Sequence, residues 1–187
     1  MNIYYSQFPT GFGPMMAVAD EKGLLHLSFQ KGEDPIVPQK NWIEVLLKGK
    51  SGKSHSNLKT KNKNTNITKS ILETLRKTQS EIESYLSGKN SSPKIKFGEL
   101  KGTDFQQRVW KRLAAIPYGK TRTYGQIAKE IGLPKAARAV GAACGANPVL
   151  IFIPCHRVVG ANGSLTGFSS GLEFKVQLLE KEGSLPP

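Results

Sequence analysis

The sequence predicts an α/β protein of two domains, a small sheet domain followed by a mainly helical one. Three observations carry this prediction. Short β-prone segments separated by turn residues fill positions 1–47. A stretch rich in Gly, Ser, Asn and Pro follows at 87–93. Beyond it, helical patterns begin with Thr or Pro. We expect domains at 1–90 and 103–187, with a linker at 91–102.

The first domain takes its strands from apolar and aromatic runs at 3–5, 15–19 and 24–29. The tetrapeptide Asp-Glu-Lys-Gly at 20–23 is typical of a hairpin turn between the last two strands. Apolar residues at helical spacing predict an amphipathic helix over 70–86. His26 has no partner spacing around it, so a structural role is favoured over a ligand role.

The segment 48–69 differs in composition from the rest of the first domain. It holds seven lysines and no acidic residue, interspersed with Ser, Asn, Gly and Thr. Such a composition cannot bury a core, so we expect a mobile, solvated, basic loop that includes His55. Non-specific phosphate binding by this loop is the functional alternative.

The second domain begins with a helix after Thr103. Thr103 is a good N-cap, and Gln106 is its capping-box partner. Phe105, Val109, Trp110 and Leu113 give this helix an apolar face. The domain closes with a helix over 172–181.

Two short helices in the middle of this domain predict a helix-turn-helix. Thr123 caps the first, over 124–131, and Pro134 takes the first helical position of the second, over 135–143. The second helix is mostly Ala and carries one Arg, so it has almost no side chains that read bases. It suits docking by shape in the minor groove, with Arg138 reaching in. An Ala-rich core helix is the alternative.

Charge and cysteine content narrow the class of protein. The net charge is +13 and the pI is near 9.8, which favours a polyanionic partner. Residues 88–187 carry a net +9, against +4 for residues 1–87. Neither a signal peptide nor a membrane span is expected. Cys144 and Cys155 cannot form a disulfide framework, so a reducing compartment is expected.

The apolar run that precedes Cys155 predicts a buried strand ending at Pro154. Cys155 then stands at the end of that strand, with His156 as a potential base and Arg157 beside it. Pro154 restricts the backbone on both sides and holds the thiol in one direction. A buried structural thiol is the alternative interpretation.

From Gly102 to Gly183 the sequence resembles the catalytic domain of the O6-alkylguanine-DNA alkyltransferases, the methylated-DNA–protein-cysteine methyltransferases. The resemblance rests on Gly-Thr-Asp-Phe-Gln, Ile-Pro-Tyr-Gly, Thr-Tyr-Gly, Ala-Arg-Ala-Val-Gly, Asn-Pro and Ile-Pro-Cys-His-Arg-Val, in this order. Residues 1–90 resemble the family's N-terminal domain only in outline. The resemblance implies a first domain of RNase H-like α/β fold and a second, catalytic domain of winged-helix or helix-turn-helix type.

The resemblance also implies the catalytic roles. Cys155 accepts the alkyl group, His156 acts as a base through a water, and Glu182 orients that histidine. Asn147 braces the active-site turn. Tyr124 displaces the 3′ phosphate and donates to the guanine as charge leaves it.

Further residues are implied in DNA and base contacts. Arg138 fills the gap that the extruded nucleotide leaves in the stack. The remaining DNA contacts are expected at Tyr124, Ala136, Ala137, Ala139, Gly141, Thr103 and Gln106. The pocket for the base is expected at Pro154, Val158, Phe168, Ser169 and Ser170.

The implied reaction is direct DNA repair of a double-stranded partner containing O6-alkylguanine. An alkyl group on O6 is buried in the duplex, so the base must be flipped out. A thiolate then attacks the alkyl carbon and forms a thioether, which thiol exchange does not reverse. Each molecule therefore acts once, as a methyltransferase that consumes itself. The sequence leaves open whether O4 of thymine is also repaired.

Two positions depart from the family pattern. Ser170 stands where a second Gly is frequent and is expected to narrow the pocket, and Phe168 replaces a frequent Tyr. The zinc ligands of some members are missing, so no metal and no cofactor is expected. We expect a monomer without a membrane partner, cytoplasmic, or nuclear in a eukaryote.

Three other functions compete with alkyl transfer. A non-catalytic alkyltransferase-like protein would lack the acceptor cysteine, whereas Cys155 is present. A winged-helix regulator would leave Asn147, His156 and Glu182 without a role and would bind a specific sequence. A thiol hydrolase would need an oxyanion hole, for which no motif is visible.

Overall fold

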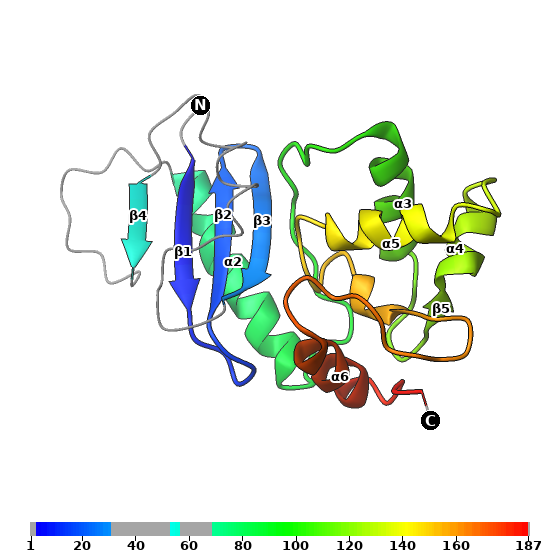
Figure 1. The fold of residues 1–187 in the computed structure, drawn as a ribbon. Helices are drawn as coiled ribbons and strands as arrows, with labels where there is room; N and C mark the ends of the chain where they lie inside the picture. The colour runs from blue at the N-terminus through cyan, green and yellow to red at the C-terminus, as the bar shows by residue number, and fades with distance from the viewer. Residues whose placement is uncertain (1–2, 31–52, 57–68, 187) are drawn as a thin grey trace. The chain divides into compact units, whose positions relative to one another are not determined.

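The computed structural model describes residues 3–30, 53–56 and 69–186 of the 187-residue chain. The chain divides into two compact units, residues 1–100 and residues 101–187 (Figure 1), and each is considered by itself. Within the described ranges, no helix is long and apolar enough to cross a membrane.

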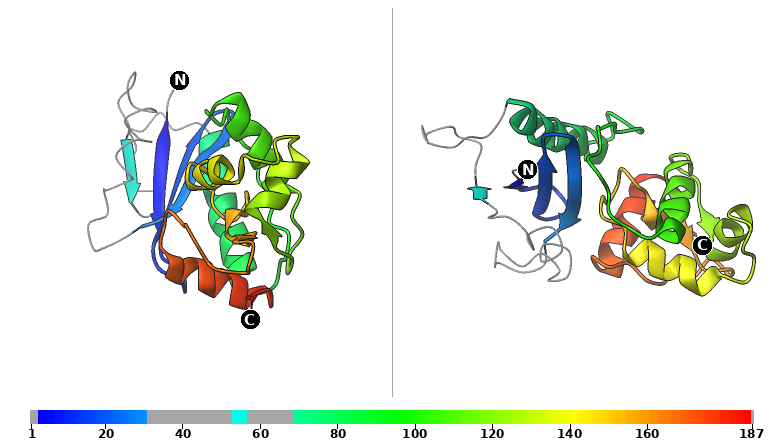
Figure 2. Two further views of the ribbon diagram at one scale, coloured as in Figure 1. Left: turned by 45° about the vertical axis from the view of Figure 1, so that its right-hand side comes forward. Right: turned by 90° about the horizontal axis from the view of Figure 1, so that it is seen from above.

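The first unit contains a four-stranded sheet covered by a helix. The strands are β1 (Tyr4–Phe8), β2 (Met15–Asp20), β3 (Gly23–Phe29) and β4 (Lys53–Ser56), in the order β3-β2-β1-β4. β1, β2 and β3 form an antiparallel meander, and β4 pairs parallel to β1. Helix α2 (Lys69–Leu86) lies along one face of the sheet in all views (Figures 1 and 2). The expected strands and helix are confirmed.

The β2–β3 turn is stabilised within the hairpin itself. Oδ1 of Asp20 accepts from the backbone N–H groups of Lys22 at 2.8 Å and Gly23 at 3.0 Å. Gly23 has a φ of 148°, and a Cβ there would lie 2.4 Å from the carbonyl oxygen of Lys96. Only glycine permits both this backbone conformation and this approach. Leu24 N–H in turn donates to Lys96 O at 2.9 Å, so part of the expected linker lies against β3.

Helix α2 and the sheet form the core of the first unit, as the amphipathic pattern predicts. The helix buries one apolar stripe at 71, 75, 82 and 85 against the strands. The expected loop at 48–69 needs correction at 53–56, because these four residues form β4. A parallel partner at the sheet edge can recruit a polar segment through main-chain hydrogen bonds alone. Apart from Lys69, which begins α2, the rest of that segment lies outside the described residues.

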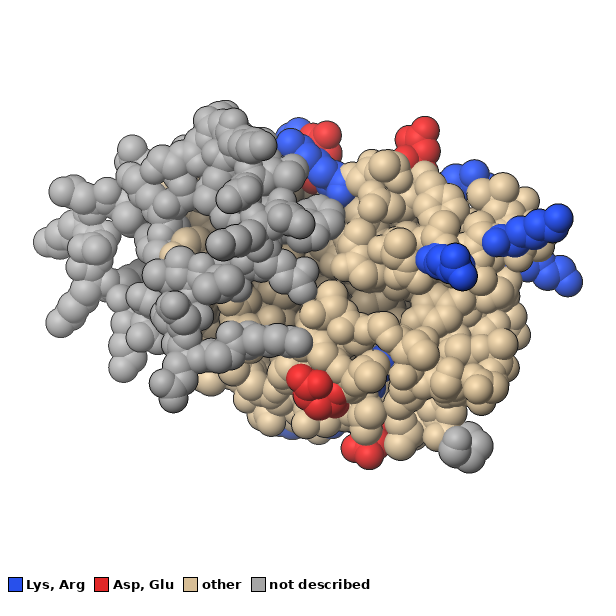
Figure 3. Space-filling model, viewed as in Figure 1, with Lys and Arg blue, Asp and Glu red and all other residues tan. Residues whose placement is uncertain are grey.

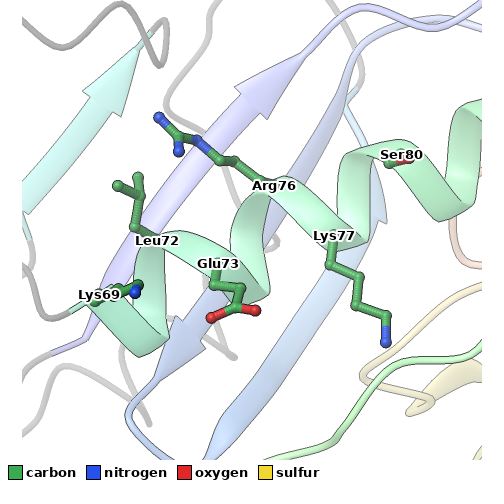
Figure 4. Close-up of a pocket in the computed structure, with 6 residues that line it drawn as sticks. All are labelled: Lys69, Leu72, Glu73, Arg76, Lys77 and Ser80. Carbon is green, nitrogen blue, oxygen red and sulfur yellow. The ribbon is translucent and has the colours of Figure 1, made fainter.

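A surface pocket of about 510 Å³ runs along α2 (Figure 4). Its described lining comes from that helix alone and mixes charged and apolar side chains. None of the expected site residues contributes to it. The lining residues are Lys69, Leu72, Glu73, Arg76, Lys77 and Ser80.

The second unit is mainly helical. Helices α3, α4 and α5 pack against one another, and a short parallel pair, β5 with β6, lies beside them (Figure 1). Trp110 of α3 donates its indole N–H to Ala143 O of α5 at 2.9 Å, which joins two helices at their buried faces. The elements are α3 (Asp104–Ala114), β5 (Arg122–Thr123), α4 (Tyr124–Glu130), α5 (Ala137–Gly145), the 3-10 turn η1 (Cys155–Arg157), β6 (Val158–Val159) and α6 (Leu172–Lys181).

Two capping boxes start the first helices of this unit. Thr103 Oγ1 accepts from the N–H of Gln106 at 3.3 Å, and Gln106 Oε1 accepts from Thr103 N–H at 2.8 Å. Thr123 and Gln126 repeat this arrangement at 3.1 and 2.7 Å. Each box satisfies two backbone donors that a helix start leaves open, so both predicted starts are confirmed.

Helix α5 begins two residues later than expected. It starts at Ala137, with Ala136 at the N-cap position, and it extends to Gly145. Pro134 lies in the preceding turn, which the Ala136 N–H closes by donating to Leu133 O at 2.8 Å. Proline presets the φ of a turn as well as that of a first helical turn, so the sequence signal was ambiguous.

Candidate active site

The chain between α5 and η1 is a series of tight turns, not the strand that the apolar run predicts. Phe152 N–H donates to Leu150 O at 2.8 Å, and Ile153 N–H donates to Val149 O at 3.0 Å. Ile151 has a φ of 70°, a strained conformation for a β-branched residue. All but one of the residues at 147–155 are buried. Burial explains the apolar composition of this segment. The periodicity of a run this short cannot distinguish a buried strand from buried turns.

Asn147 holds these turns together with one side chain. Its Oδ1 accepts from Val149 N–H at 3.0 Å. Its Nδ2 donates to Ile153 O at 2.6 Å and to Cys155 Sγ at 3.1 Å. The amide therefore binds both ends of the turn and aims one donor at the sulfur.

Cys155 is the first residue of η1 and is buried, with 4% of its surface exposed. Burial raises the pKa of its thiol to about 11, against the lowering effects of the Asn147 hydrogen bond and the nearby Lys175 ammonium. The resting sulfur is therefore a protonated thiol near neutral pH. Anion formation there needs a base and stabilising donors.

His156 lies beside Cys155 and contacts Glu182. Its Nε2 is 3.0 Å from Glu182 Oε1, and both side chains are fully buried. Burial lowers the pKa of His156, and the Glu182 carboxylate opposes that shift. A neutral imidazole at pH 7 is able to accept a proton.

Arg157 completes this group from the other side of the carboxylate. Its Nε donates to Glu182 Oε2 at 2.9 Å, and its Nη2 donates to Glu182 Oε1 at 2.8 Å. Its Nη1 donates to Ile116 O at 2.6 Å, and its guanidinium lies over the Tyr118 ring at 5.8 Å. This two-pronged contact places a positive charge beside a buried carboxylate and fixes its orientation. Glu182, at the C-cap of α6, thus joins the segment that follows Cys155 to the last helix.

Two buried cations of this site were not assigned roles from the sequence. Arg157 is one, and Lys175 is the other. Lys175 Nζ donates to Val158 O at 2.6 Å and to Thr166 O at 3.0 Å. A signal for Lys175 was present, because it lies three and four residues before the buried Leu178 and Leu179, on the same helical face.

Tyr124 begins α4 and reaches the loop before α6. Its hydroxyl donates to Thr166 O at 2.8 Å, and its ring lies 5.9 Å from Lys175 Nζ. Burial is the main cause that raises the Tyr124 pKa. Of the expected pocket residues, Pro154, Val158 and Ser170 are buried, and Phe168 and Ser169 are half-buried.

The expected DNA-contacting residues are more exposed. Arg138 and Ala139 in the first turn of α5 are exposed, whereas Ala136 and Ala137 are half-buried. Gly141 faces Tyr124, since a Cβ there would lie 3.7 Å from the ring. Thr103 and Gln106 already use their side chains in the capping box of α3.

Positive side chains gather near this surface. Figure 3 shows Lys and Arg on the side of the second unit that carries α4. The exposed basic residues from α4 to the start of α5 are Lys129, Lys135 and Arg138. Across the described ranges, no three His, Cys, Asp or Glu residues are grouped so as to hold a metal ion.

Comparison with known proteins identifies the family. Residues 104–184 match the model of the 6-O-methylguanine DNA methyltransferase DNA-binding domain. The methylated-DNA–protein-cysteine methyltransferase of Methanosarcina acetivorans is 42% identical over 182 residues, which are 97% of this chain and 99% of that protein. An inducible enzyme of the same name from Bacillus subtilis is 55% identical over 102 residues, 54% of this chain and 56% of that protein.

Solved structures agree with the sequence relatives. The Mycobacterium tuberculosis O6-methylguanine methyltransferase has a TM-score of 0.73 at 34% identity, over 99% of this chain and 95% of that one. The same M. tuberculosis protein has been solved in complex with DNA, with a TM-score of 0.73 over 98% of this chain and 95% of that one. The chain belongs to the methylated-DNA–protein-cysteine methyltransferase family. The family resemblance, and with it the expected enzyme class, is confirmed.

Proposed function

We propose that this chain repairs DNA directly, by moving an alkyl group from O6 of guanine in a duplex to the sulfur of its own Cys155. One observation carries this assignment of the acceptor. The Asn147 amide donates to the Cys155 sulfur at 3.1 Å, and the neighbouring His156 contacts Glu182 at 3.0 Å. The site thus combines a nucleophile, a base and a group that orients the base.

The proton of the thiol leaves first. Cys155 rests as a thiol because burial raises its pKa, and His156 rests neutral because burial lowers its pKa. Since His156 Nε2 contacts Glu182, the incoming proton goes to Nδ1, directly or through a water. Glu182 then stabilises the imidazolium that forms.

Alkyl transfer is a single displacement at carbon. The S–C bond forms as the C–O6 bond breaks, and the electron pair of that bond stays on guanine, which takes up a proton. The Tyr124 hydroxyl is the donor that meets this charge. The product is a thioether, so each molecule acts once.

Helices α4 and α5 form the helix-turn-helix of the proposed DNA interface. Small residues line α5, so its backbone can approach the minor groove closely. The edges of the bases in this groove distinguish base pairs poorly, so recognition there depends mainly on the shape of the DNA. The exposed Arg138 takes the place of the flipped guanine in the stack. Thr103, Gln106, Ala136, Ala137, Ala139 and Gly141 contact the DNA backbone through their main chain and small surfaces.

The flipped base occupies a pocket between β6 and the loop before α6. The burial of Pro154 and Val158, close to Cys155 in the chain, and of Ser170 in the loop before α6 supports this position; Phe168 and Ser169 are half-buried in the same loop. Ser170 narrows the pocket and favours a methyl group over bulky O6 substituents.

The proposal extends to the fold and the domains. The order β3-β2-β1-β4, with β4 parallel to β1, supports an RNase H-like first domain. The arrangement of α3, α4, α5 and the β5–β6 pair supports a winged-helix domain at 103–187 that binds DNA and accepts the alkyl group. The chain acts as a monomer, since one site holds all the reacting groups.

A single-turnover assay tests this function. The protein is mixed with a duplex that carries one O6-methylguanine labelled on the methyl, and the label is then located by peptide mass. We expect one methyl per molecule, on the Cys155 peptide. Cys155→Ala should abolish transfer and retain binding to the duplex, and Cys144→Ala, at the other buried thiol, should transfer normally.

Other outcomes would overturn the proposal. Tight binding to the lesion without transfer would indicate a lesion-recognition protein. Equal binding to lesion and undamaged duplex, without transfer, would indicate a regulator. Label on Cys144 would move the acceptor to α5.

A further inference from the structure

Lys175 is a buried cation that the proposed reaction does not yet use. It lies in the first half of α6, and its side chain has no exposed surface. A lysine loses favourable hydration when it is buried, so it is retained in a core only with specific partners. The partners of Lys175 therefore indicate its role.

Two of these partners are carbonyl groups from different segments. Val158 O belongs to β6, directly after the turn that holds Cys155, and Thr166 O belongs to the loop that leads to the base pocket. The ammonium donates to both, at 2.6 and 3.0 Å. One side chain of α6 thereby sets the spacing between two walls of the pocket.

Thr166 O also accepts from the Tyr124 hydroxyl, at 2.8 Å. In the protein without DNA, the hydroxyl that should donate to guanine is therefore already engaged. A carbonyl oxygen has two lone pairs, so it accepts from both groups at once. When Tyr124 turns to the guanine, Lys175 still donates to Thr166 O, and no buried carbonyl is left without a partner.

The charge of Lys175 acts on the same site. The ammonium is held on Val158 O, three residues after Cys155, at 2.6 Å. From there it lowers the pKa of Cys155, while burial lowers the pKa of Lys175 itself, against the effect of the two cysteines. The groups that interact with it electrostatically are Cys155 on η1, Cys144 on α5 and His156, and the Tyr124 ring faces it from α4. Lys175 is the one ammonium group among them, and a positive charge near the sulfur favours an anion over a thiol there.

We propose that Lys175 is a positioning residue for alkyl transfer: it holds the Val158 and Thr166 carbonyls while the Tyr124 hydroxyl moves from Thr166 to the guanine, and its charge stabilises the Cys155 thiolate. This inference rests on the proposed function for its first half. Its second half, the charge effect on Cys155, holds for any electrophile.

Three variants separate the two halves. Lys175→Met shortens the side chain by one atom and removes charge and donors, whereas Lys175→Gln, of similar length to Met, removes the charge and keeps donors. Lys181→Met removes a less buried lysine from the same helix and serves as the control. For each protein we would measure single-turnover methyl transfer at saturating duplex, and labelling of Cys155 by iodoacetamide as a function of pH without DNA.

We expect Lys175→Met to slow transfer by about tenfold or more at unchanged affinity for undamaged duplex. The pH midpoint of Cys155 labelling should rise by about one unit in both Lys175 variants. Lys175→Gln should keep more of the transfer rate than Lys175→Met, and Lys181→Met should match the wild type.

A double-mutant cycle tests the exchange of hydrogen bonds. In a Tyr124→Phe background there is no hydroxyl to leave Thr166. Lys175→Met should therefore reduce the transfer rate by a smaller factor in that background than in the wild type. If Lys175→Met reduced the transfer rate by the same factor in both backgrounds, the proposed exchange of hydrogen bonds at Thr166 would be overturned. A folded Lys175→Met protein with wild-type transfer and labelling would overturn the whole inference.

The two proposals fail in different ways. A wild-type protein that transfers no methyl group contradicts the proposed function, while the labelling profiles still decide the charge effect of Lys175. If Lys175→Met does not fold, as judged by circular dichroism, methyl transfer and labelling are both measured on Lys175→Gln. Wild-type values for that variant would overturn the inference.

Discussion

The two units of this protein differ in how they satisfy their buried polar side chains. In the first unit, Asp20 accepts from N–H groups two and three residues away, and His26 Nε2 lies 2.9 Å from the hydroxyl of Ser28. In the second unit several of the partners come from distant parts of the chain. His156 and Glu182 are 26 residues apart, and Arg157 and Ile116 are 41 apart.

The difference separates a structural role from a functional one. A polar side chain that hydrogen-bonds to the backbone of its own turn stabilises that turn, and its removal destabilises mainly that turn. Groups that converge from several elements cost more to bury, because each must be held by the fold in a set direction. In the second unit this convergence surrounds one thiol, where charge must move during the reaction.

Glu182→Gln should have the largest effect on transfer. It removes the charge that faces the buried Arg157 and the group that orients His156. We expect transfer to slow by roughly 10²-fold, as for loss of a general base. The free energy of unfolding should fall by about 3 kcal/mol, since one partner of a buried ion pair is lost.

Single-turnover kinetics and urea unfolding measure these two effects. Glu180→Gln is the matched control, because Glu180 lies on the same helix and is exposed. If both variants transferred at the wild-type rate, the contact with Glu182 would have only a structural role.

Asn147→Ala should have an intermediate effect. It leaves Val149 N–H and Ile153 O without their partner and should lower the free energy of unfolding by about 2 kcal/mol. Loss of its donor to sulfur should raise the pKa of Cys155 further and slow iodoacetamide labelling roughly tenfold at a given pH.

The control for this variant is Asn162→Ala, in an exposed turn where the side chain accepts from Ser164 N–H. Labelling of Cys155 at the same rate in both variants would mean that the amide does not act on the sulfur.

His26→Gln should leave transfer unchanged and alter only the pH dependence of stability. Burial lowers the pKa of His26 to about 4 from 6.5 in the unfolded chain. The unfolded state then binds more protons between these values, so stability is complete above pH 6.5 and is lost as the pH falls. We expect His26 to account for a loss of about 2 kcal/mol between about pH 7 and about pH 5.

Denaturant unfolding at the two pH values measures this loss. The wild type should lose more stability than His26→Gln, in which the titrating group is absent. Identical pH dependence in both proteins would contradict the buried, neutral state of His26.

Much of the molecule was predictable because its signals are local. The hairpin at Asp20, the capping boxes at Thr103 and Thr123, and the amphipathic α2 each depend on residues within a few positions. The segment before Cys155 was predicted wrongly as a strand. Its residues are apolar because the segment is buried. The chain turns instead of extending because the Asn147 side chain donates hydrogen bonds to residues six and eight positions later.

The roles of Arg157 and Lys175 show the limit of such signals. The acceptors of Arg157 lie on Glu182 and Ile116, and those of Lys175 lie on Val158 and Thr166, all nine or more residues away in the sequence. The position of Lys175 on the apolar face of the last helix indicates a buried lysine. It does not indicate which carbonyl groups accept hydrogen bonds from that lysine.

The sequence by itself determined the order of the helices and of the first three strands, the family, the candidate nucleophile and its neighbouring base, because these follow from local patterns and motifs. Only the tertiary structure decided which groups surround the sulfur. Burial raises the pKa of Cys155, and Asn147 and Lys175 lower it by reaching the thiol from other elements. Such effects depend on distance and desolvation, which exist only once the chain has folded.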